Sequence, residues 1–395
     1  MGNEPNARAI FAAVIAVFFA FMGIGVVDPI LPTIASEMGA QPWQTEMLFT
    51  SYLGLMAICM LFVAPISTRL GSRRTLLFAL VGVIVFSAVC GLMTQIWPLA
   101  AVRAGWGLGN AFFTPTVLAL IIGLSSNTNR AVTFFEAGLG LGIACGPLLG
   151  GFLGSISYHL PFFGTAALML IGLIATFLLV KEPEARERPQ SLSTVFKPFG
   201  NLTFLLVALT GMFYYYAYFT VLTYSPLFLH LSALVLGLIF FGWGVMVAIG
   251  SVWLVNRLLV TLKPTHLLIA SLTILLLSFL AIIFVPSTPV RIGLIIFVGL
   301  PSGICNALYT ALSVDVSPFS RSISTGAYNF LRWIGSACAP VLSGIFSTAL
   351  APIAPYVVAA IMVLICGIVL LLMGQRIDRS AATKQQAQNL SPQPI

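Results

Sequence analysis

Charged side chains are rare inside the long apolar segments of this 395-residue chain, and the few that occur there are the first candidates for chemistry. Asp28, Arg103, Glu136 and Arg332 each interrupt an apolar run. A charge at the centre of a membrane-spanning helix costs roughly 2.5–3.5 kcal/mol on insertion scales, so its presence usually reflects a function. Because a carboxylate in such a place can hold a proton or a cationic group, Asp28, Arg103 and Glu136 are candidates for proton coupling.

Asp28 and Arg103 are expected at a similar depth, because each lies about one helical turn from the same end of its apolar segment. An ion pair between them would offset the cost of burying both charges, and Asp28 could then exchange a proton for a cationic substrate. The alternatives are a fixed structural pair, or an Asp28 side chain that extends to the membrane interface.

Aromatic residues are concentrated in the segment 202–229, where Tyr214 and Tyr218 share one helix face and Tyr215 and Phe219 share the next. Aromatic faces attract lipophilic cations, so these residues are candidates for substrate binding. Lipid contact or an interfacial aromatic belt is the alternative. Further substrate-binding candidates lie in the segments 98–122 and 290–313: Trp106, Asn110, Asn306 and Tyr309.

Glycine recurs at every fourth position from Gly138 to Gly154 inside another apolar segment. Side chains four residues apart lie on one helix face, and glycine on that face allows a second helix to approach closely within a membrane. Pro147 removes one helical hydrogen bond and predicts a kink. The candidate hinge residues of this segment and of its later copy are Gly142, Gly146, Pro147, Gly150 and Pro340.

Two sequence patterns occur twice in the chain. Gly142–Gly151 matches Gly335–Gly344, and Gly107–Thr114 matches Gly303–Thr310, in the same order and at nearly the same offset. Such an internal repeat indicates two related halves. We therefore expect four regions, in chain order: an N-terminal half at 1–185, a cytoplasmic linker at 186–200, a C-terminal half at 201–375 and a disordered cytoplasmic tail at 376–395.

The composition indicates a membrane protein, because 59% of the residues are hydrophobic and 7% are charged, against about 25% charged in soluble domains. A membrane-spanning helix needs about 20 apolar residues. The sequence predicts an all-α protein with twelve such helices in two six-helix halves. The expected spans are 9–32, 45–66, 75–94, 98–122, 131–153, 161–181, 202–229, 233–255, 265–285, 290–313, 322–346 and 354–374.

The basic residues predict the orientation. Fifteen of the 18 Lys and Arg residues fall on one side under this assignment, and that side is expected to be cytoplasmic. Both termini would then be cytoplasmic, in an integral protein of the plasma (inner) membrane. The net charge of +8 therefore reports membrane topology and does not indicate a nucleic-acid partner.

The chain lacks the patterns of an enzyme or a metal protein. Its six cysteines lie in apolar spans without metal-ligand spacing, and His159, His230 and His266 fall in expected loops. We find no nucleotide-binding loop and no catalytic triad, so we expect no enzymatic activity, no cofactor and no metal.

Several of these segments resemble the major facilitator superfamily, and in particular its twelve-helix drug/proton antiporters. Gly142–Gly151 resembles the antiporter signature of the fifth helix, Leu99–Gly107 the arginine-containing motif of the fourth helix, and Asp28–Pro32 the acidic motif of the first. The resemblance implies a monomeric transporter in the lipid bilayer with a cavity lined by helices 1, 4, 7 and 10. It implies export of hydrophobic, cationic small molecules in exchange for protons by alternating access.

Two other functions remain open at this stage. One is a transporter of the same fold for a specific small polar metabolite, and the other is a membrane sensor that does not transport. The scarcity of polar residues in the expected cavity helices favours the drug exporter over the metabolite transporter.

The loop between the second and third helices departs from the family pattern, because Thr68 replaces an aspartate that helps to latch the inner gate. We expect Glu136 to supply the missing acid; a proton carrier or a passive surface charge are the alternatives. Arg332 could pair with Asp315 or bind an anionic group. The basic and glycine residues expected at this inner gate are Arg69, Gly71, Arg73, Arg74 and Arg130.

Overall fold

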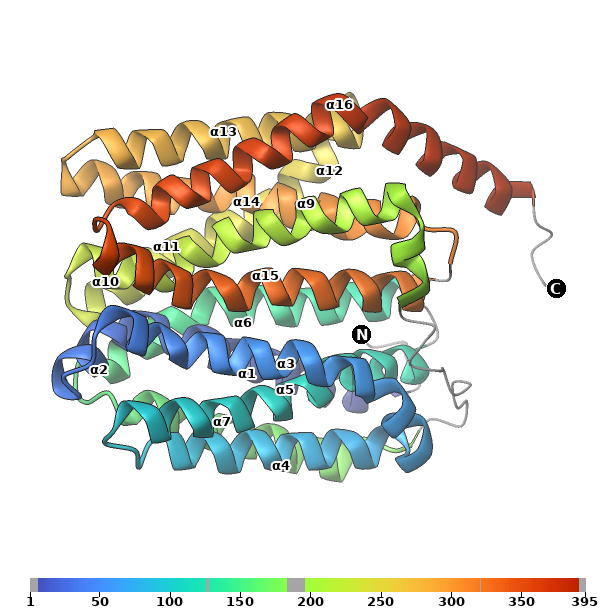
Figure 1. Cartoon of the computed structure of the whole chain (residues 1–395). Helices are drawn as coiled ribbons and strands as arrows, with labels where there is room; N and C mark the ends of the chain where they lie inside the picture. Colours follow the sequence, from blue (N-terminus) through green and yellow to red (C-terminus); the bar gives the residue numbers. More distant parts are fainter. Residues whose placement is uncertain (1–5, 126–127, 183–195, 320, 391–395) are drawn as a thin grey trace.

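The computed structural model describes residues 6–125, 128–182, 196–319 and 321–390. Within these residues the regular structure is entirely helical, and twelve helices are long and apolar enough to cross a membrane. The predicted all-α fold is therefore confirmed. Figure 1 shows the helices as a bundle of long rods lying side by side.

The first half of the bundle contains seven α-helices and one short 3-10 helix. They are α1 (Ala7–Gly25), η1 (Asp28–Ile30), α2 (Leu31–Glu37), α3 (Pro42–Leu70), α4 (Ser72–Cys90), α5 (Ile96–Leu124), α6 (Thr128–Gly154) and α7 (Leu160–Leu179). The second half begins with η2 (Lys197–Gly200). It continues with α9 (Leu202–Phe219), η3 (Thr220–Tyr224), α10 (Ser225–Leu229), α11 (Ala233–Ala248), η4 (Ile249–Leu254), α12 (Val255–Leu258), α13 (Pro264–Phe284), α14 (Thr288–Asp315), α15 (Arg321–Ala349) and α16 (Ala354–Leu390).

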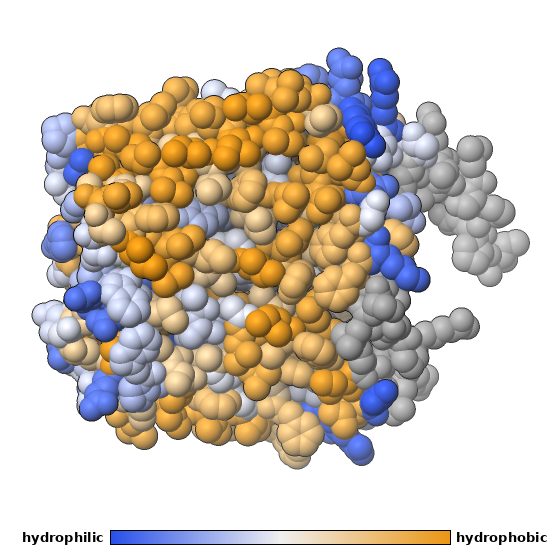
Figure 2. Space-filling view, in the orientation of Figure 1, coloured by the Kyte–Doolittle hydropathy of each residue, from blue (hydrophilic) through white to orange (hydrophobic). Residues whose placement is uncertain are grey.

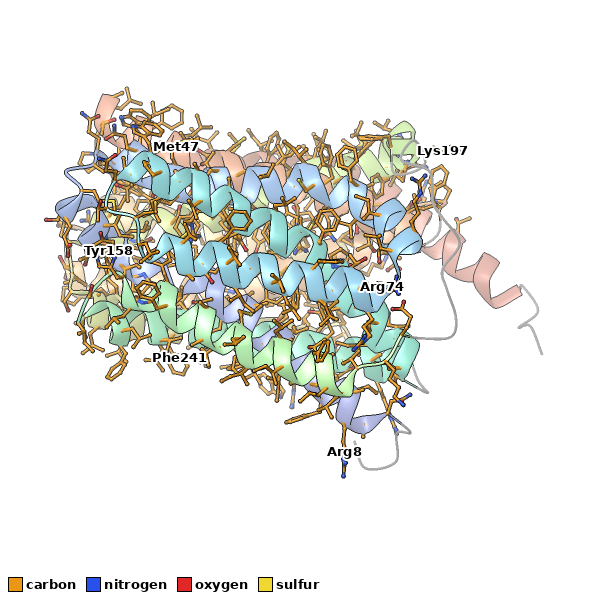
Figure 3. The ribbon with its side chains drawn as sticks, turned by 90° about the horizontal axis from the view of Figure 1, so that it is seen from below. Arg8, Met47, Arg74, Tyr158, Lys197 and Phe241 are labelled. Atoms are coloured by element: carbon orange, nitrogen blue, oxygen red, sulfur yellow. The ribbon has the colours of Figure 1, made fainter. Side chains whose placement is uncertain are left out.

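The two ends of the bundle differ in charge. We call the end that carries Arg8, Arg74 and Lys197 the basic end (Figure 3). We call the opposite end, which includes Tyr158 and the start of α3 at Pro42, the far end. Figure 2 shows a broad apolar surface between hydrophilic patches at the two ends, as expected for a protein surrounded by lipid.

The glycine stripe of α6 packs directly against the backbone of α1. A Cβ atom at Gly142 would lie 2.5 Å from the carbonyl oxygen of Phe18, and one at Gly146 would lie 2.5 Å from that of Met22. At Gly150 it would collide with the carbonyl group of Val26. The predicted close helix approach is confirmed, and its partner is the first helix of the same half.

A second side of α6 packs against α11 of the other half. A Cβ atom at Gly151 would lie 2.6 Å from the carbonyl oxygen of Ala233, and one at Gly237 would lie 2.6 Å from that of Pro147. Gly244 approaches Ala144 in the same way. The two halves therefore meet along α6 and α11, with the closest glycine contacts near the far end.

The repeat predicted from sequence is reproduced in the packing. Gly335 of α15 contacts the carbonyl group of Met212 in α9, as Gly142 contacts α1. Gly344 contacts Trp43 at the start of α3, as Gly151 contacts the start of α11. The two copies thus make equivalent contacts, one within their own half and one with the other half.

The α3–α15 contact includes a hydrogen bond that joins the halves beside Pro340. The hydroxyl of Thr50 donates to the carbonyl oxygen of Ala337 at 2.8 Å and accepts from the backbone N–H of Val341 at 3.2 Å. A side chain inserted into a helical hydrogen-bond ladder next to a proline is a recognised cause of bending. This contact and the α6–α11 contact close the far end.

The C-terminal region differs from the sequence-based expectation. We expected a disordered tail at 376–395, whereas α16 continues to Leu390. The hydroxyl of Thr265 donates to the carboxylate of Asp378 at 2.8 Å, and the following residues are rich in the helix formers Ala, Lys and Gln. Local propensity thus extends the helix beyond its apolar part. Most of the expected linker at 186–200 lies outside the described residues.

Candidate functional site

Asp28 lies where the first membrane span is interrupted. The α-helix α1 ends at Gly25, and the chain continues through the 3-10 helix η1, with Pro29 following Asp28. Asp28 is fully buried, and neither of its carboxylate oxygens has a hydrogen-bond partner within the protein. A buried carboxylate without a partner is costly in the ionised form, so this residue is suited to binding a proton or a cation.

Arg103 of α5 is also fully buried, and aromatic rings surround it. Its Nε donates to the carbonyl oxygen of Leu48 at 2.9 Å. Its guanidinium carbon lies 5.2 Å from the ring centre of Phe49 and 5.1 Å from those of Tyr52 and Trp106. Such cation–π contacts stabilise a desolvated cation by about 2 kcal/mol or more.

The expected direct pair between Asp28 and Arg103 is not formed in this structure. The charge of Arg103 acts on Asp28, so the two groups are within electrostatic range. Nη1 and Nη2 of Arg103 nevertheless have no hydrogen-bond partner, and neither do the oxygens of Asp28. The bond from Nε to Leu48 and the three rings hold the guanidinium against α3, which accounts for the difference.

Trp106 and Asn110 lie in the core of the first half. The Trp106 ring packs edge-on against Tyr52 and Phe162, and Asn110 donates from Nδ2 to the hydroxyl of Tyr52. Both residues are almost completely buried. Gly107, between them, contacts the backbone of Tyr52. These contacts join α5 to α3 and α7, and they help to position Arg103. The predicted role of both residues in substrate binding stays a prediction.

The aromatic residues of α9 form a buried cluster with α14 and α11. The hydroxyl of Tyr214 lies 2.7 Å from the carbonyl oxygen of Ser302 and 3.0 Å from Oδ1 of Asn306, and its single proton can be donated to either. The Tyr214 ring stacks on Tyr309 with 5.4 Å between centroids. The structure brings together these candidates from two separate segments, and their role in substrate binding stays a prediction.

Tyr218 and Tyr215 connect this cluster to charged residues. Tyr218 packs against Trp243 of α11 at 5.0 Å between centroids, and the charge of Asp28 acts on it from the other half. The Tyr215 ring lies 4.8 Å from the guanidinium carbon of Arg332. Phe219 packs against Trp333, the residue after Arg332. The aromatic cluster therefore lies between two charged regions.

Glu136 lies on α6 and is exposed. Its charge acts on Arg332 and Tyr215 of the other half. Sequence reasoning did not anticipate this approach, because the two residues are nearly 200 positions apart. The expected role of Glu136 as a latch for the basic loop stays a prediction.

A different acid, Glu182, contacts the loop between α3 and α4. Its carboxylate accepts the backbone N–H groups of Ser72 at 2.7 Å and Arg73 at 2.8 Å, which are the first two residues of α4. Anions are stabilised at helix N-termini by the free N–H groups and the helix dipole. The sequence-based expectation missed Glu182, because it directly follows the expected span 161–181 in a stretch that contains several other charged residues.

Two of the remaining gate candidates, Gly71 and Arg73, lie at this contact. Gly71 has φ +92°, a conformation that favours glycine, and a Cβ there would lie 3.0 Å from Glu182 Oε1. Arg73 donates from Nε to the carbonyl oxygen of Val180 at 2.7 Å. Arg69, Arg74 and Arg130 are exposed at the same end. The side chain of Thr68 lies outside the described residues.

A second residue that the sequence analysis left out of the site is Glu46. It lies one turn into α3, at the start of the expected span 45–66, and is fully buried in the structure. Both of its carboxylate oxygens lack a hydrogen-bond partner, and Asp28 acts on it electrostatically. The available sequence signal was a carboxylate inside an otherwise apolar run.

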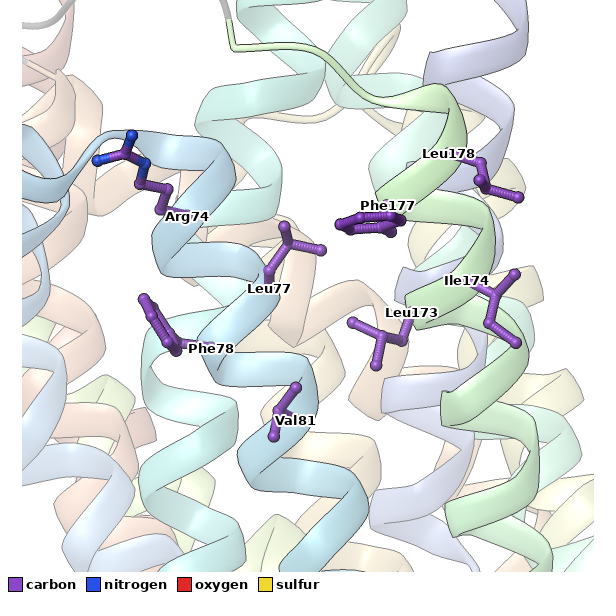
Figure 4. A pocket seen from close by; sticks show the side chains of 8 residues that line it. All are labelled: Arg74, Leu77, Phe78, Val81, Leu173, Ile174, Phe177 and Leu178. Atoms are coloured by element: carbon purple, nitrogen blue, oxygen red, sulfur yellow. The ribbon is translucent and has the colours of Figure 1, made fainter.

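A groove of about 600 Å³ lies on the membrane-facing surface between α4 and α7 (Figure 4). Apolar side chains such as Phe78 and Leu178 line it, and both are 70% exposed. Arg74 lies at its basic end. Because it faces outward and contains neither the buried charges nor any residue of the aromatic cluster of α9, the groove is not part of the candidate site.

The fold and the buried charges define a membrane transporter with two related helical halves. The family model of the Major Facilitator Superfamily matches residues 13–338, so the chain belongs to this superfamily, whose members are transporters and not enzymes. It is 40% identical over 385 residues to the multidrug efflux protein YfmO of Bacillus subtilis (strain 168), covering 95% of both chains.

Two further similarities agree with this assignment. The class B tetracycline resistance protein of Escherichia coli is 34% identical over 166 residues, or 40% of each chain. The crystal structure of a bacterial homologue of the human lysosomal transporter Spinster, described as inward-facing and unoccupied, has a TM-score of 0.75 at 16% identity, covering 96% of this chain and 98% of that one. The latter shows the fold alone.

Proposed function

We propose that this protein is a proton-coupled exporter of hydrophobic, cationic compounds that works by alternating access. The observation that carries the proposal is Asp28, a fully buried carboxylate without a hydrogen-bond partner at a break in the first span. An antiporter needs a group that holds either a proton or the charge of the substrate, and a carboxylate in apolar surroundings can do both. The 40% identity to a multidrug efflux protein supports the substrate class.

The substrate would bind between the halves, next to the aromatic cluster of α9. Tyr218 lies within electrostatic range of Asp28, and Tyr215 lies within range of Glu136. Aromatic rings beside carboxylates suit a lipophilic cation, because the rings contact its apolar body while the carboxylate offsets its charge. Because the two halves are in contact at the far end, this conformation would receive substrate from the basic end.

The orientation and assembly state are part of the same proposal. The basic end would face the cytoplasm of a plasma (inner) membrane, with both termini on that side, because basic residues are retained there during insertion. The transporter would act as a monomer, since one chain supplies both halves of the site. Labelling of single cysteines at either end by an impermeant maleimide in intact cells tests the orientation.

The test of function is proton-driven efflux from proteoliposomes that contain a lipophilic cation, measured over a series of pH gradients. In proteoliposomes with the wild-type protein, the direction of net cation movement should reverse when the pH gradient is reversed. Asp28→Asn should lose the gradient-driven component by at least about tenfold, the effect of roughly 1.4 kcal/mol. Glu37→Gln removes an exposed carboxylate near the same end of the bundle, is the matched control and should behave as wild type. An unchanged pH profile in Asp28→Asn would make Asp28 structural.

A further inference from the structure

Glu46 and Asp28 form a buried pair of carboxylates near the far end. Both are 0% exposed, and none of their four oxygens has a hydrogen-bond partner within the protein. They come from different elements, α3 and η1, that both approach Arg103. Its Nε bonds to the carbonyl oxygen of Leu48, two residues after Glu46, and the Trp106 ring beside it packs against Gly23 of α1, so the two carboxylates lie within electrostatic range of each other. Two ionised carboxylates in apolar surroundings repel each other, and each also loses its hydration.

The only cationic group that acts on this pair within the described residues is Arg103, whose charge acts on Asp28. The other titratable groups facing the pair are phenols, Tyr218 from α9 beside Asp28 and Tyr224 from η3 beside Glu46. Where α6 and α11 pack around η1, they contribute uncharged residues such as Gly150. The site therefore contains two potential negative charges and one positive charge.

Both halves of the transporter enclose this site. The segment η3 of the second half packs against α3 and places Thr223 next to Glu46, although the Thr223 hydroxyl donates to the carbonyl oxygen of Phe219. One turn further along α3, Thr50 bonds to Ala337 and Val341 of α15. Separation of α3 from both α15 and η3 would remove these contacts and expose Glu46 at the far end. Access to the carboxylate pair is thus linked to the movement of the halves.

We propose that Glu46 is a second ion-exchanging carboxylate, and that Asp28, Glu46 and Arg103 together hold one exchangeable positive charge. With the far end closed and no substrate bound, one proton on the carboxylate pair makes the three-residue site neutral. A monovalent organic cation takes the place of this proton, which passes to water at the open end, so the net charge of the site is unchanged. This inference rests on the proposed function and names a further residue of the same exchange.

The stoichiometry of proton release tests the proposal. Tetraphenylphosphonium is added to purified protein in weakly buffered detergent solution, and a pH indicator reports protons released per cation bound. Wild type should release about one, because one charge replaces one proton. Glu46→Gln should release none and bind the cation at least tenfold more weakly, whereas Glu46→Asp should restore release. Glu37→Gln removes an exposed carboxylate at the same end and should match wild type.

The results distinguish the role of Glu46 from proton coupling itself, which is the function on which this inference rests. Wild-type binding without proton release would overturn both. Release that is lost in Asp28→Asn but intact in Glu46→Gln would overturn the role of Glu46 alone.

A second measurement on the unaltered protein does not depend on the folding of a variant. Dicyclohexylcarbodiimide modifies protonated carboxyl groups in apolar surroundings, and mass spectrometry locates the label. We expect label on both Asp28 and Glu46, together at most one per chain, and protection of both by tetraphenylphosphonium. Label on Asp28 alone would contradict the shared proton.

Discussion

The two sides of α6 differ in what they join. The side formed by Gly142, Gly146 and Gly150 contacts the backbone of α1, which belongs to the same half. The neighbouring side contacts α11 of the other half through Ala144 and Gly151. Both sides rely on the absence of side chains, yet only the second has to separate when the far end opens. Close backbone packing can therefore serve a fixed contact and a reversible one in a single helix.

The later copy of this sequence, α15, repeats the arrangement with fewer glycines. Gly335 contacts α9 and Gly344 contacts α3, but Ala339 and Ser343 occupy the positions equivalent to Gly146 and Gly150. The second half thus tolerates small side chains where the first half requires none. The fixed contact of the first half thus has the longer run of glycines, and it ends next to the break that carries Asp28.

The largest effect is expected from filling the fixed side. Gly146→Leu would place a side chain against the backbone of Met22, which overpacks the α1–α6 contact at a cost of about 1–3 kcal/mol or more. Transport should be abolished and the thermal unfolding temperature lowered, while the protein still reaches the membrane. Gly140→Leu is the matched control, because no atom lies within 4 Å of a Cβ there. Normal efflux by Gly146→Leu would contradict the fixed contact.

Filling the reversible side should change conformation more than stability. The atoms nearest to a Cβ at Gly151 all belong to α11, so Gly151→Leu penalises the closed far end specifically. A penalty of about 1–3 kcal/mol shifts the equilibrium toward the open far end roughly five- to 150-fold. Maleimide labelling of a single cysteine introduced beside the far-end contact should accelerate. An equal loss of stability and transport, as in Gly146→Leu, would remove the distinction between the sides.

A smaller shift in the same direction is expected from Thr50→Val. The substitution removes the hydrogen bonds to Ala337 and Val341 but keeps the shape of the side chain. A net loss of about 0.5–1.5 kcal/mol corresponds to a roughly two- to tenfold increase in the open far end. Thr273→Val removes a hydroxyl bonded only within its own helix and serves as control. Identical labelling rates in the two variants would show that Thr50 does not hold the halves together.

The smallest effect on transport is expected from Glu182→Ala. Glu182 binds the first turn of α4 within one half, so its loss should reduce stability by about 0.5–2 kcal/mol without changing the equilibrium between conformations. Thermal unfolding measures the first effect, and far-end labelling measures the second. Altered labelling would instead assign Glu182 to the gate between the halves.

Most of the architecture could be predicted from sequence, because long apolar segments and a four-residue glycine period have few structural solutions in a membrane. The repeat predicted two related halves, and the stripe from Gly138 to Gly154 predicted a close backbone contact. The sequence did not reveal that α1 and α11 share α6 between them. That choice depends on helix positions, which a local pattern does not encode.

The site was less predictable, because its members are chosen by tertiary contacts. Arg103 and Asp28 have the right depth for an ion pair, but Leu48 and three aromatic rings hold the arginine elsewhere. Glu46 looked peripheral because it lies near the start of its span, whereas η3 of the other half covers it. In both cases the deciding neighbour is remote in sequence.

The most direct test measures two distances in the same protein, one between α6 and α11 and one between α6 and α1. In a variant lacking the six native cysteines, spin labels at exposed positions 152 and 238 report the α6–α11 separation, and labels at 11 and 141 report α1–α6. Double electron–electron resonance is recorded in lipid nanodiscs across a pH series with and without tetraphenylphosphonium. We predict a second, longer distance for 152–238 under some conditions and a single unchanged distance for 11–141. Equal changes in both pairs, or a fixed 152–238 distance in protein that transports, would contradict the account.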